Sequence, residues 1–259
     1  MTGTADIVLR VLVVLVGPAM GSFAALLAER LPKAEPVVLS RSACRSCGAV
    51  LRVRDLVPVL SWLVLRGRCA RCGAAIPAQL LQAELLGLGF GLGAAVLAPT
   101  AAVAVLGAGL LWCLLALSLA DLAHFRLPDA LTGALLVLGL ALAVAGDGSG
   151  WPGLPDRVIA AVAGAVLGAG SFAILRAAYR WRTGREGLGL GDVKLMAGIG
   201  AGLGPVALPQ VTLLAGVAAL AVAGIRAARR GRRLRARQAL PFGAFLAMAA
   251  AAIWLIRVG

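Results

Sequence analysis

The sequence has little charge and few aromatic residues for its length. Charged residues make up 14% of its 259 residues, aromatic residues make up 5%, and only 11 residues are acidic. A soluble domain typically has about 25% charged and about 45–50% apolar residues, whereas this chain is 61% hydrophobic. This balance excludes a soluble enzyme, a secreted disulfide scaffold and a disordered tail, and it predicts a protein embedded in lipid.

Apolar stretches separated by basic segments make up most of the chain. There are eight such stretches, at residues 7–28, 79–98, 101–120, 130–146, 157–178, 193–205, 208–225 and 239–257. A membrane-spanning helix needs about 20 apolar residues, so the sequence predicts an all-α polytopic membrane protein with about eight transmembrane helices. The sixth stretch is short and rich in glycine, which predicts a tilted or half-buried helix. A signal peptide is an alternative for the first stretch, but that stretch is long and no small-residue cleavage site follows it.

The basic residues predict the orientation of these helices. Of the 25 lysines and arginines, 22 fall in segments 29–78, 121–129, 176–194 and 226–237, which lie on one side of a bundle of alternating spans. Because basic residues concentrate in cytoplasmic loops, these segments are predicted to be cytoplasmic and both termini to lie outside. The net charge of +14 then reflects topology and contact with anionic lipid, above all at 226–237, and nucleic acid is not an expected partner.

The one long polar segment, 29–78, carries two C-x-x-C motifs. Their cysteines are Cys44, Cys47, Cys69 and Cys72. Two such motifs at this separation are typical of a structural four-cysteine zinc site. Gly48 and Gly73 directly follow the motifs, where a tight turn would require glycine. Disulfides or redox-active thiols are the alternatives, although thiols stay reduced in the cytoplasm.

Two aspartates at the cytoplasmic border are candidates for catalysis. Asp121 ends the third stretch, where the helix dipole and partial burial both disfavour its charged form; a solvated interfacial residue is the alternative. Asp192 follows Gly189 and Gly191 and could simply cap the sixth helix. Two carboxylates that share a site can hold one proton between them and activate water for peptide hydrolysis. We therefore predict a dyad in which Asp192 is the general base and Asp121 the acid.

Two further acids at the borders of apolar stretches have simpler explanations. Asp129 follows Pro128 where the fourth stretch begins, and both residue types are common at helix starts. Glu84, near the cytoplasmic start of the second stretch, is predicted to pair with an arginine of the basic segment or else to help bind a ligand. A transporter or an assembly component remains the competing class, because acids within membranes often mark ion pathways.

The sequence resembles the type IV prepilin peptidases, which are membrane aspartic proteases of the G-x-G-D kind. Five segments carry the resemblance in order: Gly21-Ser-Phe with Arg30-Leu-Pro32, Asp55 to Cys69, Asp121 to Asp129, Gly189-Leu-Gly191-Asp192-Val-Lys194, and Leu240-Pro-Phe-Gly243. The resemblance implies a bacterial inner-membrane enzyme that cleaves the basic leader of prepilins or pseudopilins after a glycine at the cytoplasmic border. It assigns catalysis to two residues and support to four: Asp121 and Asp192, and Gly189, Gly191, Lys194 and Asp129.

The resemblance also implies a second activity and two domains. Residues 1–98, with the zinc loop at 29–78, correspond to the part linked to N-methylation of the new N-terminus, for which S-adenosylmethionine is the methyl donor and Glu84 a candidate residue. Residues 99–259 correspond to the aspartic peptidase membrane domain. The chain departs from the family pattern at Ala25, where asparagine is common, at Gln79-Leu80, where Arg-Tyr is common, and at Ala244, where proline is usual.

Overall fold

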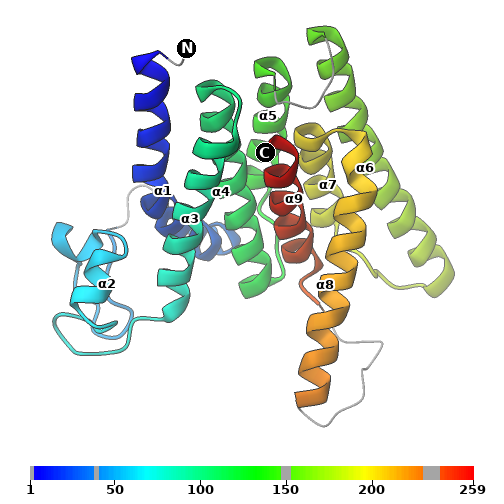
Figure 1. Ribbon diagram of the computed structural model, residues 1–259. Helices are drawn as coiled ribbons and strands as arrows, with labels where there is room; N and C mark the ends of the chain where they lie inside the picture. The colour runs from blue at the N-terminus through cyan, green and yellow to red at the C-terminus, as the bar shows by residue number, and fades with distance from the viewer. Residues whose placement is uncertain (1–2, 38–40, 147–152, 230–239) are drawn as a thin grey trace.

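The computed structural model is a bundle of helices that describes residues 3–37, 41–146, 153–229 and 240–259 (Figure 1). Its longer helices are α1 (Thr4–Arg30), α3 (Ala78–Leu97), α4 (Ala101–His124), α5 (Asp129–Ala145), α6 (Leu154–Thr183), α7 (Leu190–Leu203), α8 (Leu208–Arg229) and α9 (Phe242–Val258). Short helical turns also occur at η1 (Leu31–Lys33), η2 (Val53–Leu56), α2 (Leu60–Val64) and η3 (Pro205–Ala207). Each longer helix coincides with one of the eight apolar stretches, and the described residues form no β-strand, which confirms the predicted fold class.

The helices differ in whether they can cross a membrane by themselves. Within the described ranges, five are long and apolar enough to do so, namely α1, α3, α4, α6 and α8. The apolar helices α5 and α9 have 17 residues each, which is at the lower limit for a span. The short α7 has 14 residues, and its Leu195, Met196 and Ile199 are buried in the bundle. The protein is thus a multi-pass membrane protein with a short helix inside it.

The central helix of the bundle is α4. It packs against α1, α3, α5 and α9, and its middle, residues 110–117, is buried along its whole length. Helices α1 and α3 approach each other closely because glycines face each other: a Cβ at Gly17 would lie 2.8 Å from the carbonyl oxygen of Gly87. Small residues of this kind allow membrane helices to pack backbone to backbone.

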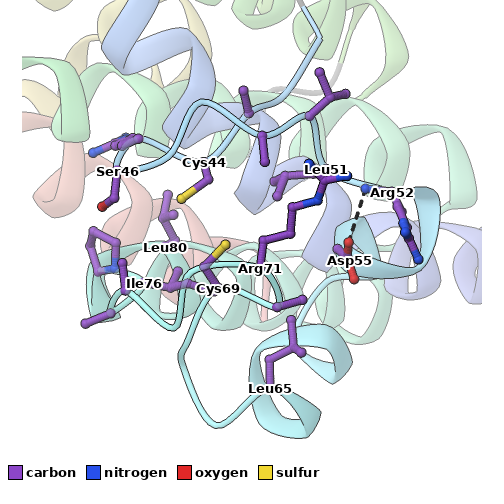
Figure 2. Close-up of a pocket in the computed structure, with 18 of the residues that line it drawn as sticks. Cys44, Ser46, Leu51, Arg52, Asp55, Leu65, Cys69, Arg71, Ile76 and Leu80 are labelled. Atoms are coloured by element: carbon purple, nitrogen blue, oxygen red, sulfur yellow. Dashed lines mark hydrogen bonds between the residues drawn. The ribbon is translucent and has the colours of Figure 1, made fainter.

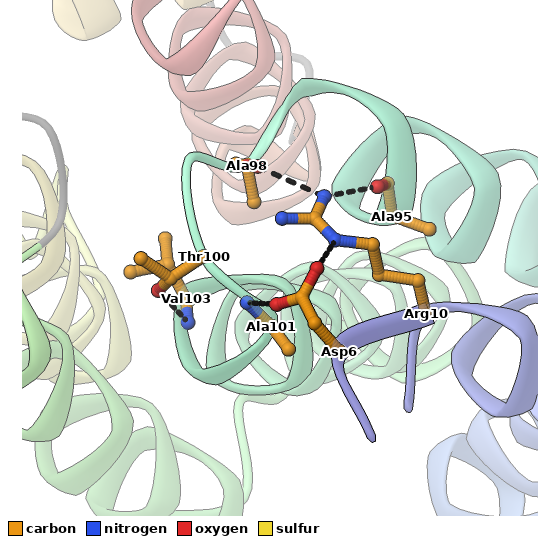
Figure 3. Close-up of polar contacts among 7 residues, drawn as sticks. All are labelled: Asp6, Arg10, Ala95, Ala98, Thr100, Ala101 and Val103. Atoms are coloured by element: carbon orange, nitrogen blue, oxygen red, sulfur yellow. Dashed lines mark hydrogen bonds and ion pairs between the residues drawn. The ribbon is translucent and has the colours of Figure 1, made fainter. Parts of the chain in front are cut away.

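A polar cluster ties α1 to α3 and α4 at the end of the bundle near the N-terminus (Figure 3). The guanidinium of Arg10 donates to the carbonyl oxygens of Ala95 and Ala98, at 2.6 and 2.9 Å, where α3 ends. The Asp6 carboxylate accepts from Arg10 and from the backbone N–H of Ala101, both at 2.8 Å. Asp6 and Arg10 therefore stabilise the packing of three helices.

The two ends of the bundle carry different features: the chain termini lie at one end, and the cysteine segment and the aspartates lie at the other. Both ends of the chain lie away from the side that carries the cysteine segment and α2 (Figure 1). The end of α4 and the start of α7, which carry Asp121 and Asp192, lie on the same side as the cysteine segment. Of the arginine-rich segment at 226–237, residues 230–237 lie outside the described residues.

Candidate active site

Asp121 and Asp192 come together at one point of the bundle. Asp121 lies in the last turn of α4 and Asp192 in the first turn of α7, and the two residues are only 6% and 9% exposed. Gly243, at the start of α9, lies beside both carboxylates: a Cβ there would be 3.1 Å from Asp121 Oδ2 and 3.0 Å from Asp192 Oδ1. Carboxylates are rarely buried unless they are paired, so this arrangement calls for a functional explanation.

Each carboxylate accepts one backbone hydrogen bond. The N–H of Ala244 donates to Asp121 Oδ2 at 2.8 Å, and the N–H of Gly189 donates to Asp192 Oδ2 at 3.3 Å. Asp192 is the third residue of α7 and its Oδ2 caps that helix, as one interpretation of the sequence had it. Its other oxygen, Oδ1, lies beside Gly243, as Asp121 Oδ2 does. Nothing in the sequence around Ala244 indicates this donor, because the contact joins residues 123 positions apart in the chain.

The two aspartates line a cavity of about 460 Å³ where α4 ends and α5 and α7 begin. A volume of this size is in the range of small-molecule and peptide side-chain sites. The cavity wall also contains Leu31 and Pro32 of η1, which nothing near them in the sequence links to the aspartates. Residues from the N-terminal segment and from the two aspartate-bearing helices thus build one site.

The four supporting residues play different structural parts. A Cβ at Gly191 would lie 3.0 Å from the Leu127 Cβ, so the start of α7 needs a small residue where it crosses the α4–α5 turn. Gly189 contributes its N–H to Asp192. Asp129 and Lys194 form an ion pair at 2.6 Å on the cavity wall, with side chains that are 75% and 41% exposed. Asp129 also begins α5, in keeping with its predicted role at a helix start.

The four clustered cysteines form a second candidate site in the segment between α1 and α3. The sulfurs of Cys44, Cys47, Cys69 and Cys72 all lie within 4.8 Å of one another. The Sγ atoms of Cys44 and Cys72 are 3.9 Å apart, close to the ~3.8 Å that four sulfurs have around a tetrahedral ion with metal–sulfur bonds of ~2.3 Å. All five cysteines of the chain are described, and all are free thiols. The cluster could therefore bind a metal ion.

The backbone of the two motifs supports the cysteine cluster. Gly48 and Gly73 have φ of +68° and +69°, which explains the glycine after each motif. Backbone N–H groups of Cys47 and Ser46 lower the pKa of the Cys44 thiol to about 6, and a deprotonated thiol is the form that binds metal. Figure 2 shows the side chains of Cys44 and Cys69 pointing toward each other beside a cavity of about 230 Å³.

Among the described residues, the partner of Glu84 is a backbone N–H and not the arginine that the sequence suggested. Its Oε2 accepts from the backbone N–H of Val59 at 2.7 Å. Val59 has φ +63° and ψ −53°, and the N–H of Leu60 donates to the carbonyl oxygen of Pro58 at 2.6 Å. This is a γ-turn with positive φ, which is strained for a β-branched residue. Glu84 of α3 therefore holds a strained turn in front of α2.

Comparisons with known proteins agree with this architecture. A family model described as the bacterial peptidase A24 N-terminal domain matches residues 15–97, and the model of the type IV leader peptidase family matches residues 108–224. No solved structure matches the chain significantly.

Several curated relatives share most of the sequence. The chain is 42% identical to the prepilin leader peptidase/N-methyltransferase of Burkholderia pseudomallei strain 1026b, over 86% of this chain and 70% of that protein. It is 39% identical to the protein of the same name from Aeromonas hydrophila, over 82% of this chain and 70% of the relative. It is 38% identical to the type 4 prepilin-like proteins leader peptide-processing enzyme of Escherichia coli O78:H11, over 82% of this chain and 74% of that enzyme. The chain therefore belongs to the type IV leader peptidase family, the prepilin peptidases.

Proposed function

We propose that this chain cleaves the leader peptide of prepilins or pseudopilins with Asp121 and Asp192 as the catalytic pair. The observation that carries this proposal is the meeting of the two buried carboxylates, from α4 and α7, on one cavity. Family membership supports the substrate class. The cavity lies at the end of the bundle, where a peptide bond next to a membrane-embedded substrate helix can reach it.

In the proposed reaction the pair shares one proton and acts on a water molecule. Asp192, at the positive end of α7, takes a proton from water, and the water oxygen attacks the carbonyl carbon of the scissile bond. Asp121, at the negative end of α4, holds the shared proton and gives it to the carbonyl oxygen. The C–N bond then breaks as Asp192 gives the proton it took from water to the leaving nitrogen, which becomes the new N-terminal amine, and Asp121 takes its proton back from the collapsing hydroxyl group. The two residues titrate as one coupled system.

We assign zinc to the cysteine cluster and N-methylation of the new amine to the N-terminal part, residues 1–98, leaving 99–259 as the peptidase part. Four thiolates give zinc a closed, structural coordination shell with no position left for substrate. S-adenosylmethionine supplies an activated methyl group when it is bound. The names of the relatives, which include N-methyltransferase, support this second activity.

The charge distribution supports an orientation with the cysteine loop in the cytoplasm and both termini outside. A reporter active only in the cytoplasm is then expected to work when inserted near residue 50, 183 or 232, and to fail when fused after Gly259. The reverse pattern would place both aspartates on the wrong side of the membrane for leader cleavage.

Mass spectrometry of a prepilin after incubation with the purified protein and S-adenosylmethionine tests both activities together. The expected product lacks the basic leader, begins directly after the glycine and carries one added methyl group. An unprocessed prepilin would contradict the peptidase assignment. A cleaved product without the methyl increment would leave a peptidase alone.

A further inference from the structure

A second cavity lies on the other side of α4 from the aspartates. It has a volume of about 230 Å³ and is enclosed by the end of α1, the first cysteine motif, the start of α3 and the end of α4. Its polar lining consists of Glu29, Lys33, Arg45, Gln79 and His124, and alanine and leucine side chains complete its walls. Neither Asp121 nor Asp192 reaches it.

The two cavities share α4 and the α1–η1 junction as walls. Asp121 and Phe125 line the aspartate cavity, whereas Ala123 and His124 line the second one. Residues two apart, such as Asp121 and Ala123, lie on opposite sides of a helix. The same alternation occurs at η1, where Pro32 lines the first cavity and Lys33 the second. Because a helix with its side chains is ~10 Å wide, an N-terminus released at the aspartates has a short way to travel to the second cavity.

We propose that this second cavity binds S-adenosylmethionine through the amino-acid end of the methyl donor. The proposal rests on the methyl transfer proposed above and adds the place where the donor is held. In this proposal Glu29 binds the ammonium group of the donor, and Arg45 and Lys33 bind its carboxylate.

The charges of the cavity complement this ligand. Glu29 forms ion pairs with Arg45 and with Lys33, the latter at 3.8 Å. A ligand that carries an ammonium and a carboxylate on one carbon can enter between these partners and replace each contact with one of its own, and guanidinium–carboxylate pairs are among the stronger hydrogen-bonded contacts. The C-terminal ends of α1 and α4 are partially negative, which favours the sulfonium, and the N-terminal end of α3 is partially positive, which favours the carboxylate.

Other ligands fit the second cavity less well. A basic leader peptide would meet the two cations Lys33 and Arg45, and an anionic lipid headgroup would meet the carboxylate of Glu29. The cavity beside the cysteines is lined by several arginines, and Asp55 is the one acid among its lining residues. An overall cationic methyl donor therefore fits the second cavity better than the one in Figure 2.

His124 can take the proton that methyl transfer releases. In the reaction, the lone pair of the new N-terminal nitrogen forms a bond to the methyl carbon, and the carbon–sulfur bond breaks with its electrons going to sulfur. The nitrogen must lose a proton, and imidazole is the side chain suited to accept one near neutral pH. His124 is half-buried, lines the cavity and has no hydrogen-bond partner among the described residues.

The arrangement also explains how the cysteine loop can contribute to methylation although its cysteines do not contact the methyl group. Arg45 lies inside the first C-x-x-C motif, between Cys44 and Cys47, and reaches Glu29 at the end of α1. A metal ion that fixes the motif therefore fixes one wall of the cavity.

Binding of labelled S-adenosylmethionine to the full-length protein in lipid nanodiscs tests the proposal. Glu29→Gln and Arg45→Gln are expected to weaken binding by about 10-fold or more, since each loses a contact to a charged group. His124→Gln is expected to bind the donor but to give a lower ratio of methylated to unmethylated cleaved pilin. Glu35→Gln and Arg41→Gln, which change exposed charges in the same segment, serve as matched controls and should bind and methylate normally.

Each result has a distinct meaning. If wild type binds the donor and methylates, but Glu29→Gln and Arg45→Gln behave like the controls, the cavity assignment is wrong and the proposed function stands. If wild type cleaves prepilin but neither binds the donor nor methylates, methyl transfer itself is wrong. Ultraviolet cross-linking of the labelled donor to wild type is a second measurement that needs no variant to fold. Label in peptides containing 25–33, Arg45, Gln79-Leu80 or 119–124 supports the cavity, and label confined to other peptides overturns it.

Discussion

The cysteine cluster and the aspartate pair are assembled in different ways. In the cluster, each C-x-x-C motif is one turn of backbone, with a glycine at positive φ directly after it, and the segment around it is largely exposed. In the pair, Asp121 and Asp192 come from different helices, are buried, and are completed by the backbone of α9. The first site depends on local geometry and the second on the packing of three helices, so substitutions should affect them in different ways.

The largest effect is expected at the aspartates. Asp121→Asn and Asp192→Asn keep the side-chain size but remove the shared-proton chemistry, so prepilin cleavage should fall by about 10²–10⁴-fold or become undetectable. Circular dichroism and metal content should match wild type, since neither change affects the cysteine loop. Near-normal processing by either purified variant would rule out the aspartic mechanism.

The cysteine cluster should respond with metal loss. Cys44→Ser or Cys72→Ser removes one of four thiolate ligands, so zinc should be released and loop 29–78 should become more sensitive to protease. Methylation should fall with the metal, while cleavage is much less affected. Elemental analysis measures the metal, and Cys113→Ala, which changes a buried cysteine outside the cluster, is the matched control. Wild-type protein without zinc and with two disulfides would contradict the assignment.

A substitution in α9 tests the hydrogen bond from Ala244 to Asp121 without changing the other residues of the site. Ala244→Pro removes the N–H that donates to Asp121, but it lies in the first turn of α9, where the proline ring is tolerated. Because Asp121 holds the shared proton and a hydrogen bond to a neutral group contributes about 0.5–1.5 kcal/mol, we expect cleavage to slow by about 2- to 10-fold. Ala244→Gly keeps the N–H and should cleave nearly as wild type. Equal rates for the two variants would show that this contact does not position Asp121.

A smaller effect is expected at Glu84, where substitutions can distinguish a structural role at the Val59 turn from a chemical role in methylation. If Glu84 only holds the turn at Val59, Glu84→Gln keeps an acceptor oxygen and should methylate within a few-fold of wild type. Glu84→Ala leaves the strained turn without its partner, so hydrogen exchange at residues 57–64 should increase. Loss of methylation in Glu84→Gln with an unchanged exchange pattern would instead give the carboxylate a chemical role.

The smallest effect is expected at Asp129. Its ion pair with Lys194 is largely exposed, and exposed pairs contribute about 0–1 kcal/mol. Asp129→Asn should therefore cleave prepilin within about five-fold of wild type in the same assay. A dead Asp129→Asn variant, with Asp121→Asn still active, would put Asp129 in the place of Asp121 in the catalytic pair.

Some of these features follow from short stretches of sequence. Apolar stretches separated by basic segments predicted the eight helices, because a helix in lipid satisfies its own backbone hydrogen bonds and needs little from its neighbours. The C-x-x-C spacing predicted the cysteine cluster, since each motif brings its own two sulfurs together. Asp192 and Asp129 were expected at helix starts because capping acts within one turn.

Other features depended on which helices pack together. Nothing local to Glu84 indicates Val59, nothing local to Asp6 indicates Ala101, and Ala244 is an ordinary alanine until α9 packs on α4. The same holds for the second cavity, whose walls at Glu29, Arg45 and His124 come from three segments. The sequence by itself determined which segments are helices and which motifs bring the cysteines together, because these depend on the hydropathy and spacing of neighbouring residues. Only the tertiary structure decided the partner of each buried polar group, because those partners are distant in the chain and are selected by close packing of the helices.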